Sequence, residues 1–281
     1  DTEENMKAIT DYKSGIKLVE EASLFCKPMY ASKIFGEHTD PDLSTLERRS
    51  IFSVQQALNL LKDFVDEDFL KETQLIFSTT KGDVTFLESG REILDSRVFL
   101  NHTAKVTADY FKLKREPLVV SNACISGVNA VVSASRLISS GYCKHAIIVG
   151  ADLLSRFVVT GFQSFHSIST GPCIPYDTKR DGLTLGEAVG VIVLTGDRAI
   201  VSDEDPIVVE GGAISNDANH LSAPSRTGDG IAEAMSRSIT IAGIKAEEID
   251  FINAHGTATL YNDEMEAKAF HLAGLSGVAV Q

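Results

Sequence analysis

The stretch LVVSNACISG, from Leu118 to Gly127, decides how this chain is interpreted. Its apolar start predicts a short strand, and the pattern from Gly127 to Ile138 predicts a helix. Cys124 is therefore expected in a tight turn just ahead of a helix, facing unpaired N–H groups and the positive end of the helix dipole. Both favour a reactive thiolate with a lowered pKa. The alternative is a small buried residue at a strand end.

The same alternation of short apolar runs and longer amphipathic segments continues on both sides of this stretch. It predicts an α/β fold with buried sheets. The polar stretch from Asp197 to Asp205 is the expected junction between two halves of the chain. We expect strands at 74–78, 118–120, 146–149, 190–194, 207–209, 249–252 and 278–280, and helices at 46–64, 127–138, 231–242 and 262–272.

Composition excludes several classes of protein. The chain has 281 residues, 43% of them hydrophobic, which is enough for a sizeable core and argues against disorder. Its apolar runs are too short to span a bilayer, and its start does not resemble an export signal. A net charge of −13 argues against nucleic acid and anionic membrane as partners. Together with widely spaced cysteines that form no C-x-x-C pair, this predicts a protein of the reducing cytoplasm.

The cysteines and histidines form no pattern typical of a disulfide framework or a metal site, so we expect neither. Apart from Cys124, the cysteines are expected to be packing residues, and most of the histidines surface or core residues. The cysteines are Cys26, Cys124, Cys143 and Cys173, and the histidines set aside are His38, His102, His145, His166, His220 and His271.

Four segments between Leu118 and Ala269 stand in an order that resembles one known family. SNACISG at 121–127 resembles the active-site elbow of the β-ketoacyl-[acyl-carrier-protein] synthases, elongating condensing enzymes of the thiolase-like superfamily. PYDTKRDG at 175–182 and GEAVG at 186–190 resemble the segments that follow it. NAHGTAT at 253–259 resembles the motif that carries the family's first catalytic histidine. The first hundred residues match only loosely.

The resemblance implies a thiolase-like five-layered α/β/α/β/α fold of two similar halves. The first half, 1–198, would carry the nucleophile, and the second, 206–281, would be incomplete in this chain. The family's second histidine, its lysine and its Gly-Phe-Gly-Gly loop have no counterpart in the sequence. We therefore expect a longer native chain that supplies them after Gln281.

The chemistry implied by the resemblance is a decarboxylative Claisen condensation in fatty-acid or polyketide (including aryl-polyene) elongation. Cys124 would accept an acyl group, with its own backbone N–H as half of an oxyanion hole. His255 would donate a hydrogen bond to the thioester oxygen of malonyl-acyl-carrier protein. Thr257 and Thr259 would hold the pantetheine arm, and Phe162 would line the acyl pocket. Substrates travel on the phosphopantetheine of the carrier protein, so no cofactor is expected.

Two acidic residues, Asp263 and Glu266, match acidic positions that follow the family's histidine loop. Either could orient His255 from behind. Helix capping and pairing with the helix dipole would explain an acidic first turn equally well.

The expected partners are acyl-carrier protein and a second copy of the chain, with a related subunit in a heterodimer as an alternative. Because this chain and a carrier protein would both be acidic, docking needs a local basic cluster. Arg48 with Arg49 is the first candidate, and Lys179 with Arg180 is the second.

Three other interpretations stay open at this point. One is a coenzyme-A-dependent thiolase-type enzyme, although His255-Gly256-Thr257 favours the elongating branch. The second is a non-catalytic partner subunit, against which the presence of Cys124 argues. The third is a carrier-protein-binding fragment without turnover. The acyl chain length and the pathway are not encoded in any motif that we can identify.

Overall fold

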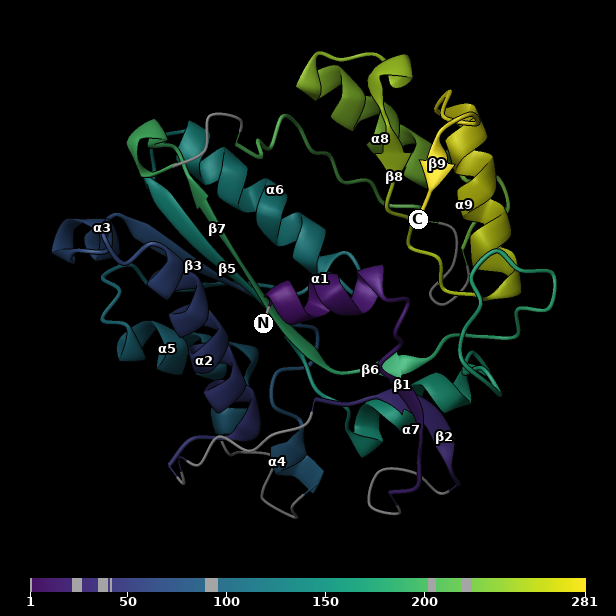
Figure 1. The fold of residues 1–281 in the computed structure, drawn as a ribbon, viewed down its shortest axis with the longest axis horizontal. Helices are drawn as coiled ribbons and strands as arrows, with labels where there is room; N and C mark the ends of the chain where they lie inside the picture. The colour runs from purple at the N-terminus through teal and green to yellow at the C-terminus, as the bar shows by residue number, and fades with distance from the viewer. Residues whose placement is uncertain are drawn as a thin grey trace. The chain divides into compact units, whose positions relative to one another are not determined.

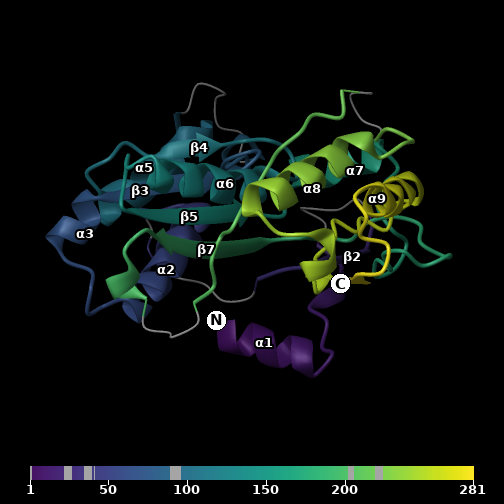
Figure 2. The ribbon, with the colours of Figure 1, turned by 90° about the horizontal axis from the view of Figure 1, so that it is seen from above.

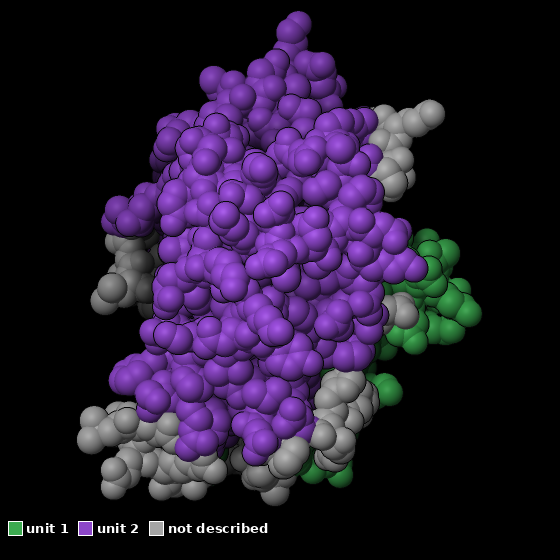
Figure 3. Space-filling model, turned by 90° about the vertical axis from the view of Figure 1, so that its left-hand side faces the viewer, with its two compact units in different colours: residues 1–36, 154–187, 256–263 green, residues 37–153, 188–255, 264–281 purple. Residues whose placement is uncertain are grey.

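The structure, a computed structural model, describes residues 2–21, 27–34, 40, 42–88, 96–201, 206–218 and 224–281. It contains two compact units (Figure 3). Unit 1 comprises Asp1–Gly36, Leu154–Glu187 and Gly256–Asp263, and unit 2 comprises Glu37–Leu153, Ala188–His255 and Glu264–Gln281. These units are not the halves 1–198 and 206–281 expected along the chain, and that division stays a prediction. Within the described ranges, no helix is long and apolar enough to cross a membrane.

Unit 2 is built on a four-stranded sheet in the order β4-β3-β5-β7, which Figure 2 shows. The strands are β3 (Thr73–Ser78), β4 (Leu118–Val120), β5 (His145–Asp152) and β7 (Ala188–Thr195). β3 pairs in parallel with both β4 and β5, whereas β7 is antiparallel to β5. The predicted strands at 74–78, 118–120, 146–149 and 190–194 are confirmed. Because β3, β4 and β5 are parallel, the loops that follow them leave the sheet at one edge.

Helices cover both faces of this sheet (Figure 1). α2 (Thr45–Leu60) and α5 (Leu100–Tyr110) lie on one face, and α6 (Ser126–Ser139) lies on the other. Side chains of β3 alternate between them: Leu75 and Phe77 enter the core with α2 and α5, and Ile76 enters the core with α6. A strand buried on both faces needs apolar residues at consecutive positions, which Leu75, Ile76 and Phe77 supply in the middle of β3.

The rest of unit 2 consists of α8 (Asp229–Ala242), most of α9 (Leu260–Leu272), and the parallel pair β8 (Phe251–Ile252) and β9 (Ala279–Val280). Gly228 precedes α8 with φ +81°, and a Cβ there would lie 2.7 Å from the carbonyl oxygen of Met265 in α9. The two helices therefore touch at a position that requires glycine. Shorter elements are α3 (Glu67–Lys71), α4 (Thr85–Glu88) and the 3₁₀ turns Ser96–Val98, Arg198–Ile200 and Ala246–Glu248.

The strand predicted at 207–209 is wrong. This segment pairs with no strand in the described part of the chain, and Ile207 is fully exposed. The residues that follow pack between helices: a Cβ on Gly211 would lie 2.7 Å from the Ser238 carbonyl oxygen of α8, and one on Gly212 would lie 2.5 Å from Val132 of α6. The apolar run has β propensity, but a strand also needs a neighbouring strand to pair with.

Unit 1 contains the small sheet β1-β2-β6, formed by β1 (Ile16–Val19), β2 (Met29–Ser32) and β6 (Leu185–Gly186). α7 (Arg156–Ser164) contributes to the apolar core on this sheet. α1 (Thr2–Thr10) precedes β1 and buries none of its residues. Glu187 fastens the unit internally, because its carboxylate accepts the N–H groups of Ile34 at 2.9 Å and Leu154 at 3.2 Å.

Candidate active site

The turn that carries Cys124 lies in unit 2 between β4 and α6, as the sequence predicts. One buried hydroxyl closes it: Ser126 Oγ accepts the N–H of Asn122 and donates to the carbonyl of Ala123, each at 2.7 Å. Ala123 has φ +45°, in the left-handed region that costs an L-residue roughly 1–2 kcal/mol. The strained residue stands directly before Cys124, whose side chain is exposed.

A hydrogen bond with His255 is the largest cause that lowers the pKa of Cys124. Partial burial opposes it and raises the pKa, while the charges of His255 and Lys81 lower the pKa further. The pKa of Cys124 is therefore lowered, as predicted, but the main source is a histidine from the loop after β8 rather than the helix start that was expected to lower it. The two residues, far apart in the sequence, meet within unit 2.

A hydrogen bond to Glu266 on α9 holds the loop that carries His255. The backbone N–H of His255 donates to Glu266 Oε1 at 2.7 Å, and Glu266 is only 3% exposed. Glu266 thus holds the peptide of His255. The contact is made to the backbone of the loop, and the expected role of Glu266 in orienting the His255 side chain stays a prediction.

Asp263, the other acidic candidate, belongs to unit 1 and is 1% exposed. Its Oδ2 accepts the N–H of Tyr176 at 2.8 Å and lies 3.5 Å from Nε of Arg180. Asp263 therefore organises the loop that contains PYDTKRDG. Its expected role in orienting His255 stays a prediction.

The residues expected to bind substrate also lie in unit 1. The hydroxyl oxygens of Thr257 and Thr259 are 2.8 Å apart and hydrogen-bond to each other. Phe162 on α7 is half-buried and packs against the apolar core of that unit. Their assigned roles toward the pantetheine arm and the acyl chain stay predictions.

Sequence reasoning missed Lys81, which follows β3 in unit 2. Its Nζ donates to Asp152 Oδ2, at the end of β5, at 2.6 Å. Its positive charge reaches Cys124 and lowers the pKa of that thiol. The sequence indicates Lys81 only when two observations are combined. A lysine stands shortly after one parallel strand, and a cysteine stands shortly after the neighbouring strand.

The remaining cysteines and histidines fit packing or surface roles where the structure describes them. Cys143 is buried, which raises its pKa, and Cys173 is half-buried. His145 is buried and stacks on Phe69 with ring centroids 4.3 Å apart. In the described segments, no group of three or more His, Cys, Asp or Glu residues is placed to hold a metal. Cys26, His38 and His220 lie outside the described residues.

The basic pairs expected to dock a carrier protein are partly engaged inside the chain. Only 11% of the Arg180 side chain is exposed; besides Asp263, it binds the carbonyl oxygens of Asp177 at 2.8 Å and Leu260 at 3.0 Å. Arg48 binds the carbonyl oxygens of Asp40 and Leu43 at the start of α2. Arg180 is thus a structural ion-pair partner rather than a freely solvated cation.

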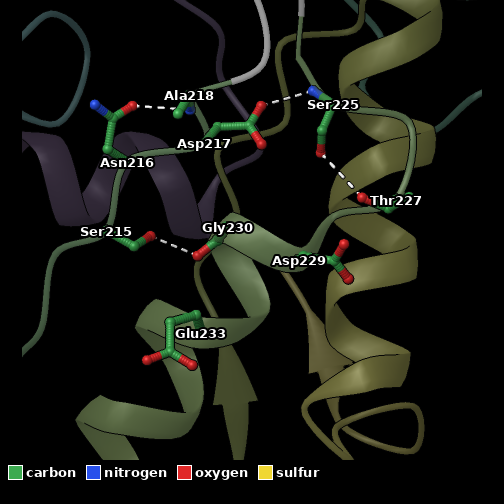
Figure 4. A pocket seen from close by; sticks show the side chains of 9 residues that line it. All are labelled: Ser215, Asn216, Asp217, Ala218, Ser225, Thr227, Asp229, Gly230 and Glu233. Carbon is green, nitrogen blue, oxygen red and sulfur yellow. Dashed lines mark hydrogen bonds between the residues drawn. The ribbon is translucent and has the colours of Figure 1, made fainter.

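A separate pocket of about 430 Å³ lies in unit 2 between the segment 215–218 and the start of α8 (Figure 4). It contains the carboxylates of Asp217, Asp229 and Glu233, all of which are exposed. Neither Cys124 nor His255 lines it. Its acidic lining would repel the anionic malonyl group, so this pocket is not where we place the chemistry.

Comparison with known proteins identifies the class. Residues 82–199 match the family model described as "Beta-ketoacyl synthase, N-terminal domain", and residues 207–276 match "Beta-ketoacyl synthase, C-terminal domain". Cys124 falls within the first match and His255 within the second. The chain belongs to the β-ketoacyl synthase family.

Individual relatives agree with this assignment. The 3-oxoacyl-[acyl-carrier-protein] synthase 2 of Synechocystis sp. is 29% identical over 245 residues, covering 80% of this chain and 59% of that protein. The enzyme of the same name from Rhizobium meliloti is 35% identical over 159 residues, covering 53% of this chain and 38% of that protein. The chain therefore matches less than two thirds of the length of either relative.

Solved structures show the fold. A β-ketoacyl synthase from Burkholderia phymatum superposes with a TM-score of 0.84 at 23% identity, covering 100% of this chain and 76% of that one. The ketosynthase ApeO from Xenorhabdus doucetiae, solved in complex with its chain length factor ApeC, gives a TM-score of 0.77 at 28% identity, with coverage of 92% and 69%. The predicted thiolase-like α/β class is confirmed.

Proposed function

We propose that this protein is an acyltransferase of the 3-oxoacyl-[acyl-carrier-protein] synthase type. It would join an acyl group held on Cys124 to malonyl-acyl-carrier protein, with loss of carbon dioxide. The observation that carries the proposal is the hydrogen bond between His255 and Cys124, at an exposed turn with a lowered thiol pKa.

The first half-reaction is acyl transfer. The Cys124 thiolate attacks the carbonyl carbon of an acyl-pantetheine thioester; the bond from that carbon to the pantetheine sulfur breaks, and pantetheine leaves as a thiolate that takes up a proton from water. The negative charge that forms on the carbonyl oxygen needs hydrogen-bond donors, for which the backbone N–H of Cys124 is our candidate. Exposure of the thiol at the turn leaves it open to a substrate.

The second half-reaction reuses His255. Once Cys124 is a thioester, its sulfur carries no charge and is a poor hydrogen-bond acceptor, so His255 becomes available to another oxygen. A hydrogen bond from His255 to the malonyl thioester oxygen would stabilise the enolate left after carbon dioxide departs. The enolate carbon then attacks the acyl carbon, and the bond from that carbon to Cys124 breaks.

The names of similar proteins support the substrate class and partners. Relatives are named 3-oxoacyl-[acyl-carrier-protein] synthase 2, and similar structures include ketosynthases solved with a chain length factor or with an acyl-carrier protein. We propose an acyl-carrier protein as the substrate carrier, with elongation of a fatty acid or polyketide as the process. We also propose that Thr257 and Thr259 hold the pantetheine arm and that Phe162 lines the acyl pocket.

The assembly and location follow from the same proposal. We propose a dimer, with a second copy as the first choice and a related subunit as the alternative. No cofactor is needed, because the substrates bring their own pantetheine. A reducing cytoplasm suits an exposed cysteine that favours the thiolate, since such a thiol is readily oxidised.

The test is the mass of the intact protein after incubation with an acyl-acyl-carrier protein. We expect one acyl group on the parent, none on Cys124→Ala, and parent-like labelling on Cys173→Ala as the matched control. Cys124→Ala should still release carbon dioxide from malonyl-acyl-carrier protein, because decarboxylation needs enolate stabilisation and no nucleophile. Acylation of a folded Cys124→Ala variant would show that Cys124 is not the nucleophile.

A further inference from the structure

The parallel strands of unit 2 bring three residues with ionisable side chains to one edge of the sheet. Ser78, at the end of β3, is level with Val120 at the end of β4 and with Gly150 near the end of β5. Lys81 follows β3 by three residues, Cys124 follows β4 by four, and Asp152 is the last residue of β5. The order β4-β3-β5 therefore places the Lys81 loop between the Cys124 turn and Asp152.

The Lys81 loop is held in place by bonds of its own. The N–H of Thr79 donates to the carbonyl of Val120 at 3.3 Å, which ties the loop to the strand that leads to Cys124. Thr79 Oγ1 accepts the N–H of Gly82 at 3.2 Å, and Gly82 has φ +62°. A Cβ there would lie 3.3 Å from Leu100 and be strained by the backbone as well. The loop is a fixed turn, so the position of Lys81 is set by the fold.

The Lys81–Asp152 pair is unevenly solvated. The Lys81 side chain is 17% exposed, whereas that of Asp152 is 48% exposed. Water screens the carboxylate more than the ammonium group, so the pair does not cancel the positive field on the protein side. In agreement, the charge of Lys81 lowers the pKa of Cys124. Asp152 holds the ammonium group of Lys81 through the 2.6 Å contact at the end of β5.

We propose that Lys81 is a positioning charge that stabilises the thiolate of Cys124, with Asp152 as its anchor. This rests on the proposed role of Cys124 as nucleophile and adds the charge of Lys81 to the hydrogen bond with His255. Other ionisable groups near this edge are Asp152 itself and Asp83, which is buried and accepts a hydrogen bond from the Thr85 hydroxyl. Lys81 would act through its charge on the free thiol, before Cys124 accepts an acyl group, and needs no contact with the substrate.

The experiment measures the rate at which iodoacetamide alkylates Cys124 as a function of pH, read by peptide mass so that the other cysteines do not contribute. Lys81→Gln and Lys81→Met should raise the pH midpoint by about 0.5 to 1 unit, because a nearby opposite charge favours the ionised form. Lys81→Arg, which keeps the charge, should stay near the parent. Lys105→Met, which removes an exposed charge on α5, is the matched control and should not move the midpoint.

Salt gives a second measurement that needs no Lys81 variant. In His255→Ala the charge of Lys81 still acts on the thiol of Cys124, so raising ionic strength from about 0.01 to about 1 M should raise the midpoint. If folded Lys81→Gln and Lys81→Met keep the parent midpoint, or folded Lys81→Arg shifts as far as they do, the proposal is wrong. If neither neutral variant folds, a midpoint in His255→Ala that ignores salt overturns it.

Alkylation needs no carrier protein, so this test separates the two proposals. A midpoint that moves as expected in a protein that never forms an acyl-enzyme would support the thiolate role of Lys81 and refute the condensing activity. Acyl transfer without a shift in midpoint would do the opposite.

Discussion

Two charged clusters of this protein differ in how well their charges are matched. At the Cys124 turn in unit 2, the thiol is exposed, His255 and Lys81 both favour its anion, and about half of the Asp152 side chain is exposed. In unit 1, Asp263 and Arg180 form a pair that is 1% and 11% exposed. The buried pair balances its own charges and organises a loop. The exposed cluster instead leaves a positive field directed at a reactive sulfur.

The difference suggests a simple criterion for separating chemistry from architecture in such a chain. Both clusters lie in segments that resemble family motifs, so resemblance alone does not distinguish them. A charge that is buried and paired must be matched to be tolerated. A charge imbalance beside an accessible nucleophile costs less stability, because water solvates it, and it changes reactivity. Variants of the two clusters should therefore fail in different assays.

The largest effect should come from His255→Ala. Loss of the hydrogen bond that lowers the pKa of Cys124 should raise the pH midpoint of alkylation, so the thiolate fraction at neutral pH falls. Carbon dioxide release from malonyl-acyl-carrier protein should fall roughly 10²-fold, as happens when one oxyanion donor is removed. Cys124 should still accept an acyl group at raised pH.

His271→Ala, which changes an exposed histidine on α9, is the control for this variant. It should leave the alkylation midpoint and the decarboxylation rate at parent values. A His255→Ala protein that decarboxylates at the parent rate would remove His255 from the proposed mechanism.

The buried pair should respond in stability. Arg180→Met leaves the Asp263 carboxylate without its cation, and breaking a buried pair in this way costs about 3 kcal/mol of unfolding free energy. Lys179→Met, at the exposed neighbour, should cost little. Denaturant unfolding measures both, and the alkylation midpoint of Cys124 should not change in either. A stability of Arg180→Met equal to that of Lys179→Met would contradict the structural role.

These two clusters also show what sequence alone predicts. The Cys124 turn follows from a local pattern, because strand, turn and helix are contiguous and each has its own signal. Strands β3, β4, β5 and β7 were found for the same reason. His255 was identified through its resemblance to a family motif. Its contact with Cys124 joins segments far apart in the sequence, and no local pattern encodes such a contact.

The features that could not be predicted from the sequence depend on contacts between distant segments. Lys81 acquires its importance only from the order of β3, β4 and β5, which no single segment specifies. The apolar run 207–209 was predicted as a strand because β propensity does not show whether a partner strand exists. Arg180 looked like a surface cation until its partner Asp263, on another segment, was placed beside it.

The smallest effect in this comparison should come from Glu266, which acts on the Cys124 cluster through the backbone of His255. Glu266→Ala removes the acceptor of the His255 N–H, and a hydrogen bond to a charged group is worth about 1.5–3 kcal/mol. If about half of that loss reaches the transition state, the decarboxylation rate should fall about four- to thirteenfold, since 1.36 kcal/mol is a factor of ten. Acylation of Cys124 should change less, because it needs no donor from the His255 ring to the substrate.

Glu266→Gln removes the negative charge but keeps an acceptor oxygen at the same place, and it should recover most of the decarboxylation rate. Such a recovery would show that the hydrogen bond to His255, rather than the charge, is what Glu266 contributes. Glu264→Ala, at an exposed position on the same helix, controls for helix stability. Carbon dioxide release and acyl-enzyme mass, measured on all three variants, separate the outcomes. If Glu266→Gln is as slow as Glu266→Ala, the charge of Glu266 matters rather than its hold on the loop, and Glu266 then belongs with the matched, architectural charges of Asp263 and Arg180.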